Sequence, residues 1–197
     1  MNPTRRRRLR ALMLGSAIAA LLAVFLFLGL RPAATTSAGL PAVVGVGSAA
    51  PDFSLPNLLS TSAEPLAAVH LDGLGKSRHH PVVLNFFASW CIPCQTETPL
   101  LAQTAKAEMA NGSPVQFIGV DVNDVPSSAV AFVQQAGIPY PVGADRTLRV
   151  TSALYGMNAQ PNTYFIDESG KIIGHHLGAL TASELTGWLH RLAGSGG

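Results

Sequence analysis

The chain has 197 residues, of which 48% are hydrophobic and 12% are charged, and its net charge is +2. Six of the thirteen basic residues lie at positions 5 to 31, so seven basic residues face all eleven acidic ones in the rest of the chain, a net charge of −4. A domain that neutralises phosphates is basic, and this balance argues against nucleic-acid binding.

The N-terminal segment has the sequence pattern of a membrane anchor. Residues 1–10 are basic, and residues 11–30 are apolar without a single charge. About 20 apolar residues are enough to cross a bilayer as a helix, and arginines beside such a helix stay in the cytoplasm. We therefore predict one pass through a bacterial inner membrane, with the remaining chain in the periplasm or at the cell exterior. A cleaved signal peptide is the alternative, although its apolar region is usually shorter.

After the anchor, residues 31–47 are small and nearly uncharged, which is typical of a flexible linker. The folded domain is expected over residues 48–193, with a loop or short hairpin at 60–81. Its regular elements begin at Pro81. We predict strands at 82–87, 115–122, 162–167 and 171–177, helices at 91–110, 127–136 and from 181 onward, a short helix near 148–155, and turns at 138–145.

The order of these elements, β-α-β-α-β-β-α, predicts an α/β fold. The first βαβ unit requires a parallel strand pair with a right-handed crossover, and the last two strands form an antiparallel hairpin. Helices should cover both sides of one mixed sheet. Thr181 and Glu184 fit a capping box at the start of the last helix. Asp145, Arg146 and Arg149 are expected as the solvated start of the short helix.

Both cysteines of the chain lie in the segment Trp90-Cys91-Ile92-Pro93-Cys94, at the predicted junction of a strand and a helix. Free N–H groups and partial positive charge at a helix N-terminus favour a thiolate. We expect Cys91 to be the nucleophile. Cys94, one turn further in and more shielded, should resolve the mixed disulfide.

Other uses of a Cys-x-x-Cys pair fit less well. A zinc site needs four ligands, and there is no second cysteine pair. Gln95 stands where a haem attachment motif requires histidine. Two inert buried cysteines are the remaining alternative. We therefore expect no metal and no cofactor other than a redox-active Cys91–Cys94 disulfide.

The residues around this pair carry a resemblance to a known family. The stretch from Asn85 to Pro99 resembles the active site of extracytoplasmic thioredoxin-like proteins. Residues 50–56 resemble the first segment of their fold, and residues 155–170 resemble their later strands. The similarity covers about residues 48–193, and the nearest group is the TlpA- and DsbE-type family, many members of which serve cytochrome c maturation. It implies a thioredoxin-like fold and thiol–disulfide exchange with proteins.

Further site residues follow from the resemblance. Pro161 matches the cis-proline that lies beside the cysteine pair, and its bent backbone, with Gln160 before it, would pair with a substrate peptide. Trp90 either contacts substrate or is a half-exposed packing residue.

A proton-transfer residue is also implied. Asn85 stands where cytosolic thioredoxins have a buried aspartate, and Glu97 matches the glutamate that TlpA-like proteins place after the second cysteine. Partial burial would raise the pKa of Glu97 and let it exchange a proton with Cys94. The alternative is a solvated carboxylate on the helix.

The direction of electron flow depends on the reduction potential, which the sequence does not fix, but the motif favours one direction. Ile92 and Pro93 add no charge that would stabilise the Cys91 thiolate, which favours a reductant supplied by a membrane thiol-electron donor. Apocytochrome c is the substrate that the resemblance implies. A general periplasmic protein-disulfide oxidoreductase, a peroxiredoxin-like thiol peroxidase and a non-enzymatic, membrane-tethered chaperone or haem carrier are the alternatives.

Overall fold

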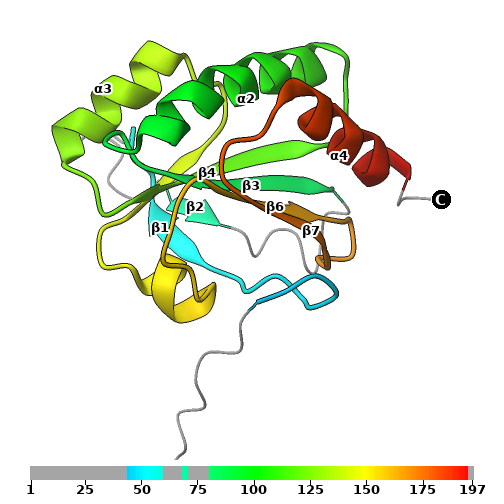
Figure 1. Cartoon of the computed structure of the whole chain (residues 1–197), viewed down its shortest axis with the longest axis horizontal. Coiled ribbons are helices and arrows are strands. Elements are labelled where there is room, and N and C mark those ends of the chain that lie inside the picture. Colours follow the sequence, from blue (N-terminus) through cyan, green and yellow to red (C-terminus); the bar gives the residue numbers. More distant parts are fainter. Residues whose placement is uncertain (1–43, 60–67, 71–79, 195–197) are drawn as a thin grey trace, which may run out of the picture. The chain divides into compact units, whose positions relative to one another are not determined.

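The computed structural model describes residues 44–59, 68–70 and 80–194. The predicted basic segment, the predicted anchor and most of the predicted linker lie outside these residues. Within the described ranges, no helix is both long and apolar enough to cross a membrane. The described elements form a five-stranded mixed sheet with covering layers on its two faces (Figure 1).

The sheet has the strand order β5-β4-β3-β6-β7. As predicted, β3 pairs in parallel with β4 and β6 pairs antiparallel with β7. All six residues of β3 are buried, because this central strand is covered on both faces. The strands span β3 Val82–Phe87, β4 Gln116–Val122, β5 Val142–Asp145, β6 Asn162–Ile166 and β7 Ile172–Leu177.

The prediction of turns alone at 138–145 is wrong, because β5 lies there and pairs in parallel with β4 at the sheet edge. This strand has four residues and contains Gly143, so it carries no periodic signal. A short antiparallel pair, β1 (Ser54–Pro56) with β2 (Ala68–His70), precedes the main sheet. Here β2 falls within the segment predicted as a loop or short hairpin.

Helices cover the two faces unequally. In Figure 1, α2 (Ile92–Ala110), α3 (Pro126–Ala136) and α4 (Ala182–Gly194) lie on one side of the sheet, and the short π-helix η2 (Arg149–Leu154) lies with β1 on the other. The packing follows the alternation of β3. Its Val83 contacts apolar side chains of α2 and α4, whereas Leu84 and Phe86 belong to the cluster that includes residues of η2 and β1.

The start of α4 confirms the predicted capping box. The backbone N–H and the hydroxyl of Thr181 both donate to Glu184 Oε2, at 2.8 and 2.7 Å. The prediction for Asp145 is wrong. Its side chain is buried, and Oδ2 accepts hydrogen bonds from the N–H and the hydroxyl of Thr151 at 2.7 and 2.8 Å. The carboxylate fixes the first turns of η2 instead of facing solvent.

Gly174 in β7 provides a test of packing under α4. A Cβ at Gly174 would lie 2.2 Å from the ring of Trp188, which stacks on Phe165 with ring centroids 4.6 Å apart. We expect Gly174→Ala to lower the free energy of unfolding by about 1–3 kcal/mol through overpacking, measured by denaturant titration. Gly187→Ala is the control, because no atom lies within 4 Å of its Cβ position and alanine favours a helix. Equal losses in the two variants would contradict the packing argument.

Candidate active site

The two cysteines lie where β3 gives way to α2. Cys91 is the N-cap residue of α2, and the backbone N–H of Cys94 donates to Cys91 Sγ at 3.3 Å. The first turn of this helix contains Pro93 and no acidic residue. Free N–H groups and the helix dipole therefore favour negative charge on the Cys91 sulfur, as predicted from the sequence.

The cysteines are joined by a disulfide bond with an S–S distance of 2.04 Å. Cys94 is fully buried, and Cys91 is 5% exposed. Cys91 is therefore the more accessible of the two residues, as expected, but both are buried in this oxidised form.

The peptide bond between Gln160 and Pro161 is cis, as the family resemblance implies. The carbonyl oxygen of Gln160 lies 3.6 Å from Cys91 Sγ, so the segment that starts β6 lies against the nucleophile. The carbonyl of Pro161 is bonded to the N–H of Gly178 at 2.9 Å, which ties this segment to the end of β7. The role of Gln160 and Pro161 in substrate binding stays a prediction.

Two apolar side chains stand in solvent beside the disulfide. Trp90 is 57% exposed, and Ile92 is 73% exposed. This exposure leaves Trp90 available for contact with a substrate, and its role stays a prediction.

Glu97 is buried, at 1% exposure, so the alternative of a solvated carboxylate is wrong. Its Oε1 accepts a hydrogen bond from the N–H of Leu180 at 3.0 Å, and its Oε2 accepts one from Asn85 Nδ2 at 3.2 Å. The same nitrogen of Asn85 donates to the Thr163 hydroxyl at 2.9 Å. Residues from β3, α2, β6 and the segment before α4 therefore meet at one carboxyl group.

Burial raises the pKa of Glu97 above that of an ordinary glutamate, and the hydrogen bonds from Leu180 and Asn85 oppose this shift. The carboxyl group lies one helical turn after Cys94 and keeps its proton to higher pH than a solvated glutamate. Its two bonds go to nitrogen donors and not to a sulfur atom, so proton exchange with Cys94 stays a prediction.

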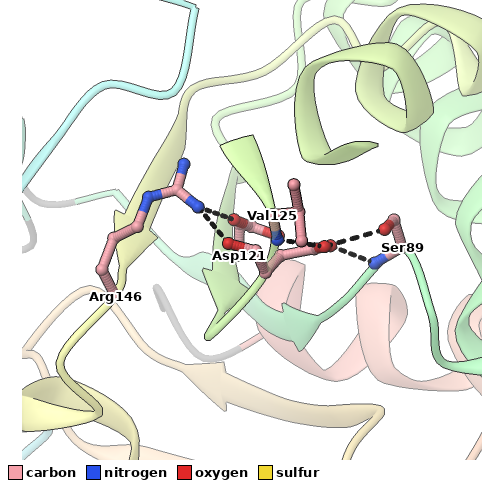
Figure 2. A network of polar contacts seen from close by, with 5 residues as sticks. Ser89, Asp121, Val125 and Arg146 are labelled. Carbon is pink, nitrogen blue, oxygen red and sulfur yellow. Dashed lines mark hydrogen bonds and ion pairs between the residues drawn. The ribbon is translucent and has the colours of Figure 1, made fainter. Parts of the chain in front are cut away.

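A second cluster of polar residues lies beside the cysteines and was not predicted from the sequence. Ser89, two residues before Cys91, donates two hydrogen bonds to Asp124 (Figure 2). The buried Asp121 and its ion-pair partner Arg146 belong to the same network. The available signal was an acidic residue, Asp121, inside an otherwise apolar strand.

Comparisons with known proteins support the interpretation of this site as a redox-active cysteine pair. Residues 46–175 match the model of the AhpC/TSA family. The chain belongs to this family. Thiol-disulfide oxidoreductase ResA of Oceanobacillus iheyensis is 32% identical over 149 residues, which cover 75% of this chain and 73% of that protein. A DsbE homolog of Paracoccus denitrificans is 37% identical over 105 residues, which cover 53% of this chain and 54% of that protein.

Comparison with solved structures gives proteins of the same type. The crystal structure of a thiol:disulfide interchange protein DsbE from Chlorobium tepidum superposes with a TM-score of 0.63 at 28% identity, covering 76% of this chain and 98% of that one. The AhpC/TSA protein described here is therefore a thioredoxin-like thiol–disulfide oxidoreductase of the ResA and DsbE type. The names of these relatives favour disulfide exchange over the peroxidase and chaperone alternatives.

Proposed function

We propose that this oxidoreductase works outside the cytoplasm, held at the inner membrane by residues 11–30, and reduces disulfide bonds of other proteins. The observation that carries the proposal is the Cys91–Cys94 disulfide at the N-terminus of α2, with the Gln160 carbonyl 3.6 Å from the Cys91 sulfur. A nucleophile at this place has a stabilised thiolate and, beside it, a backbone segment that a substrate peptide can approach.

The reaction is a pair of exchange steps. The Cys91 thiolate attacks one sulfur of the substrate disulfide, and the other substrate sulfur leaves as a thiolate. The Cys94 thiolate then attacks Cys91 Sγ and releases the second substrate thiolate. Two electrons pass to the substrate, and the enzyme is left with the Cys91–Cys94 disulfide seen in the structure. A membrane thiol-electron donor would return it to the dithiol.

The surroundings of Cys91 support the proposed direction of electron flow. The two residues between the cysteines, Ile92 and Pro93, carry no charge and are exposed. A strong oxidant needs a strongly stabilised reduced form, and here the helix N-terminus acts without a charged residue inside the motif. We therefore propose that the protein acts as a reductant.

Apocytochrome c, with the cysteines of its Cys-x-x-Cys-His segment oxidised, is the substrate that we propose. The support is the resemblance to proteins of cytochrome c maturation, together with the exposed Trp90 and Ile92 that could contact a peptide. General reduction of periplasmic proteins is the broader form of the same activity.

The decisive measurement is the reduction potential of the purified protein, by equilibration with glutathione or dithiothreitol. We expect a value nearer to that of thioredoxin, about −270 mV, than to that of DsbA, about −120 mV. A value near the DsbA end would reverse the proposed direction.

Substrate choice is tested with two oxidised peptides, one with Cys-x-x-Cys-His and one with alanine in place of histidine. Faster reduction of the first supports a role toward apocytochrome c, and equal rates support the general reductase. Consumption of hydrogen peroxide at a comparable rate would favour the peroxidase instead. Recovery of the full chain in the soluble periplasmic fraction would contradict the anchor.

A further inference from the structure

Ser89 is held from both sides in the turn that leads to Cys91. Its N–H donates to Asp124 Oδ2 at 2.6 Å, and its hydroxyl donates to Asp124 Oδ1 at 2.9 Å (Figure 2). Its carbonyl accepts a hydrogen bond from Gln95 Nε2 at 2.7 Å. Because Gln95 lies in the first turns of α2, this chain of bonds runs from the end of β4 past the nucleophile into its helix.

Asp124 is itself fixed from two directions. The N–H of Val125 donates to its Oδ1 at 2.7 Å, and Arg146 Nη1 donates to its backbone carbonyl. The carboxyl of Asp124 therefore accepts three hydrogen bonds, two of them from Ser89. Such a set of donors suits a carboxylate, and it places a fixed negative charge beside the active-site turn.

Asp121 lies close to Asp124, but its carboxyl group has fewer polar contacts. It is 1% exposed, and in the described part of the chain neither of its carboxyl oxygens accepts a hydrogen bond. Arg146 is its ion-pair partner, with Nη1 3.9 Å from Oδ2, and the Arg146 side chain is 35% exposed. One half-exposed guanidinium thus contacts the carboxyl group of Asp121 and the backbone carbonyl of Asp124.

Among the described residues, apolar side chains flank Asp121 across the sheet. Its partners across the sheet are Phe87 on β3 and Ala144 on β5. The cluster to which these two side chains belong also contains residues of α2 and α3, namely Cys91, Cys94, Ala129 and Val133.

Asp145, at the end of β5, is engaged with Thr151. Burial and the negative charge of Asp124 raise the pKa of Asp121 to about 7, against the opposing effect of Arg146.

We propose that Asp124 is a positioning residue for the Cys91 nucleophile, and that a proton on Asp121 keeps Asp124 in place. With Asp121 protonated, the only carboxylate of the pair is Asp124, which is bonded to Ser89. When Asp121 loses its proton, two buried carboxylates lie close together, and Arg146 pairs with the one on Asp121 alone. The repulsion between the two carboxylates weakens the hold of Asp124 on Ser89. The reactivity of Cys91 thereby depends on a group that never contacts the substrate.

The disulfide form of the full-length protein gives the cleanest test, because its cysteines do not titrate. We follow the amide signal of Ser89 by NMR from about pH 5 to about pH 9, a range that brackets the ionisation of a carboxyl near neutrality. In the native protein the signal should shift with a midpoint near 7. Asp121→Asn should abolish this shift, and the matched buried-acid control Asp145→Asn should keep it.

Arg146→Gln provides a second variant at a partly exposed position. Arg146 lowers the pKa of Asp121, so its loss should move the midpoint of the Ser89 shift to higher pH. A flat Ser89 signal in the native protein, a shift that survives Asp121→Asn, or a midpoint unchanged in Arg146→Gln would each overturn the proposal.

The effect on chemistry is measured with the reduced protein and a small disulfide reagent. Asp124→Asn should slow the reaction of Cys91 by about 10-fold, because a small misplacement of a reacting group costs up to about 100-fold. Ser89→Ala keeps the backbone bond to Asp124 and should fall between native and Asp124→Asn. Native rates in both variants would show that Asp124 has a structural role only.

Discussion

Replacement of Cys91 by serine should abolish disulfide exchange, whereas replacement of Cys94 by serine should trap the enzyme on its substrate. A serine hydroxyl is not ionised near neutral pH and does not attack a disulfide, so Cys91→Ser leaves no first step. In Cys94→Ser the nucleophile at the start of α2 is intact, and the buried sulfur that would release it is absent. Mass spectrometry of each variant with an oxidised peptide measures the mixed disulfide.

The two variants control for one another, because each removes one sulfur atom from the same turn. Only Cys94→Ser should gain the mass of the peptide, and reduction should reverse the gain. A peptide adduct on Cys91→Ser would show that Cys94 attacks first and that the two roles are exchanged. This outcome is a real alternative, since both cysteine residues are buried, at 5% and 0% exposure.

Replacement of Glu97 by glutamine should slow the second exchange step by about 100-fold near neutral pH, within the usual range for a general acid–base group. Cys94 must lose its proton before it attacks, and the proposed acceptor is the ionised Glu97. In the native enzyme the release of product should therefore become faster as pH rises through the raised pKa of Glu97. Single-turnover release of reduced peptide, followed over a range of pH, measures this step.

Glutamine can occupy the site without loss of the fold. The Oδ1 atom of Asn85 is buried and has no hydrogen-bond partner among the described residues, so a rotated Asn85 amide can accept a bond from the new side-chain N–H. Leu180 can still donate to the glutamine oxygen. Glu108→Gln, at the other end of α2, is the matched control and should behave as native. Identical pH profiles for the native enzyme and Glu97→Gln would indicate that the proton of Cys94 passes to solvent instead.

The sequence was sufficient to predict the frame of the active site. The segment Val82–Phe87, apolar except for Asn85, predicts a buried strand, and the Cys-x-x-Cys pair follows it after three residues. The strand-to-helix junction, and with it the role of the helix N-terminus, follows from this order alone. The capping box at Thr181 and the parallel pairing of β3 with β4 depend on similarly local signals.

What the sequence did not show depends on contacts between distant residues. β5 is a strand only because β4 lies beside it. The burial of Glu97 needs Leu180, 83 positions later, and the hold on Ser89 needs Asp124, 35 positions later. Charged residues are most often on the surface, so no local pattern indicated that Asp124 and Asp145 are buried.

The bond from Leu180 to Glu97 has a consequence for the order in which this protein matures. Leu180 lies 83 positions after Glu97, and a chain leaves the ribosome with its N-terminus first. The two cysteines therefore emerge long before the segment that completes the carboxyl site between Asn85 and Leu180. During synthesis, the nascent chain carries its thiols before the site of the group proposed to move their proton is complete. We therefore expect full exchange activity only after the segment with Leu180 has joined the fold.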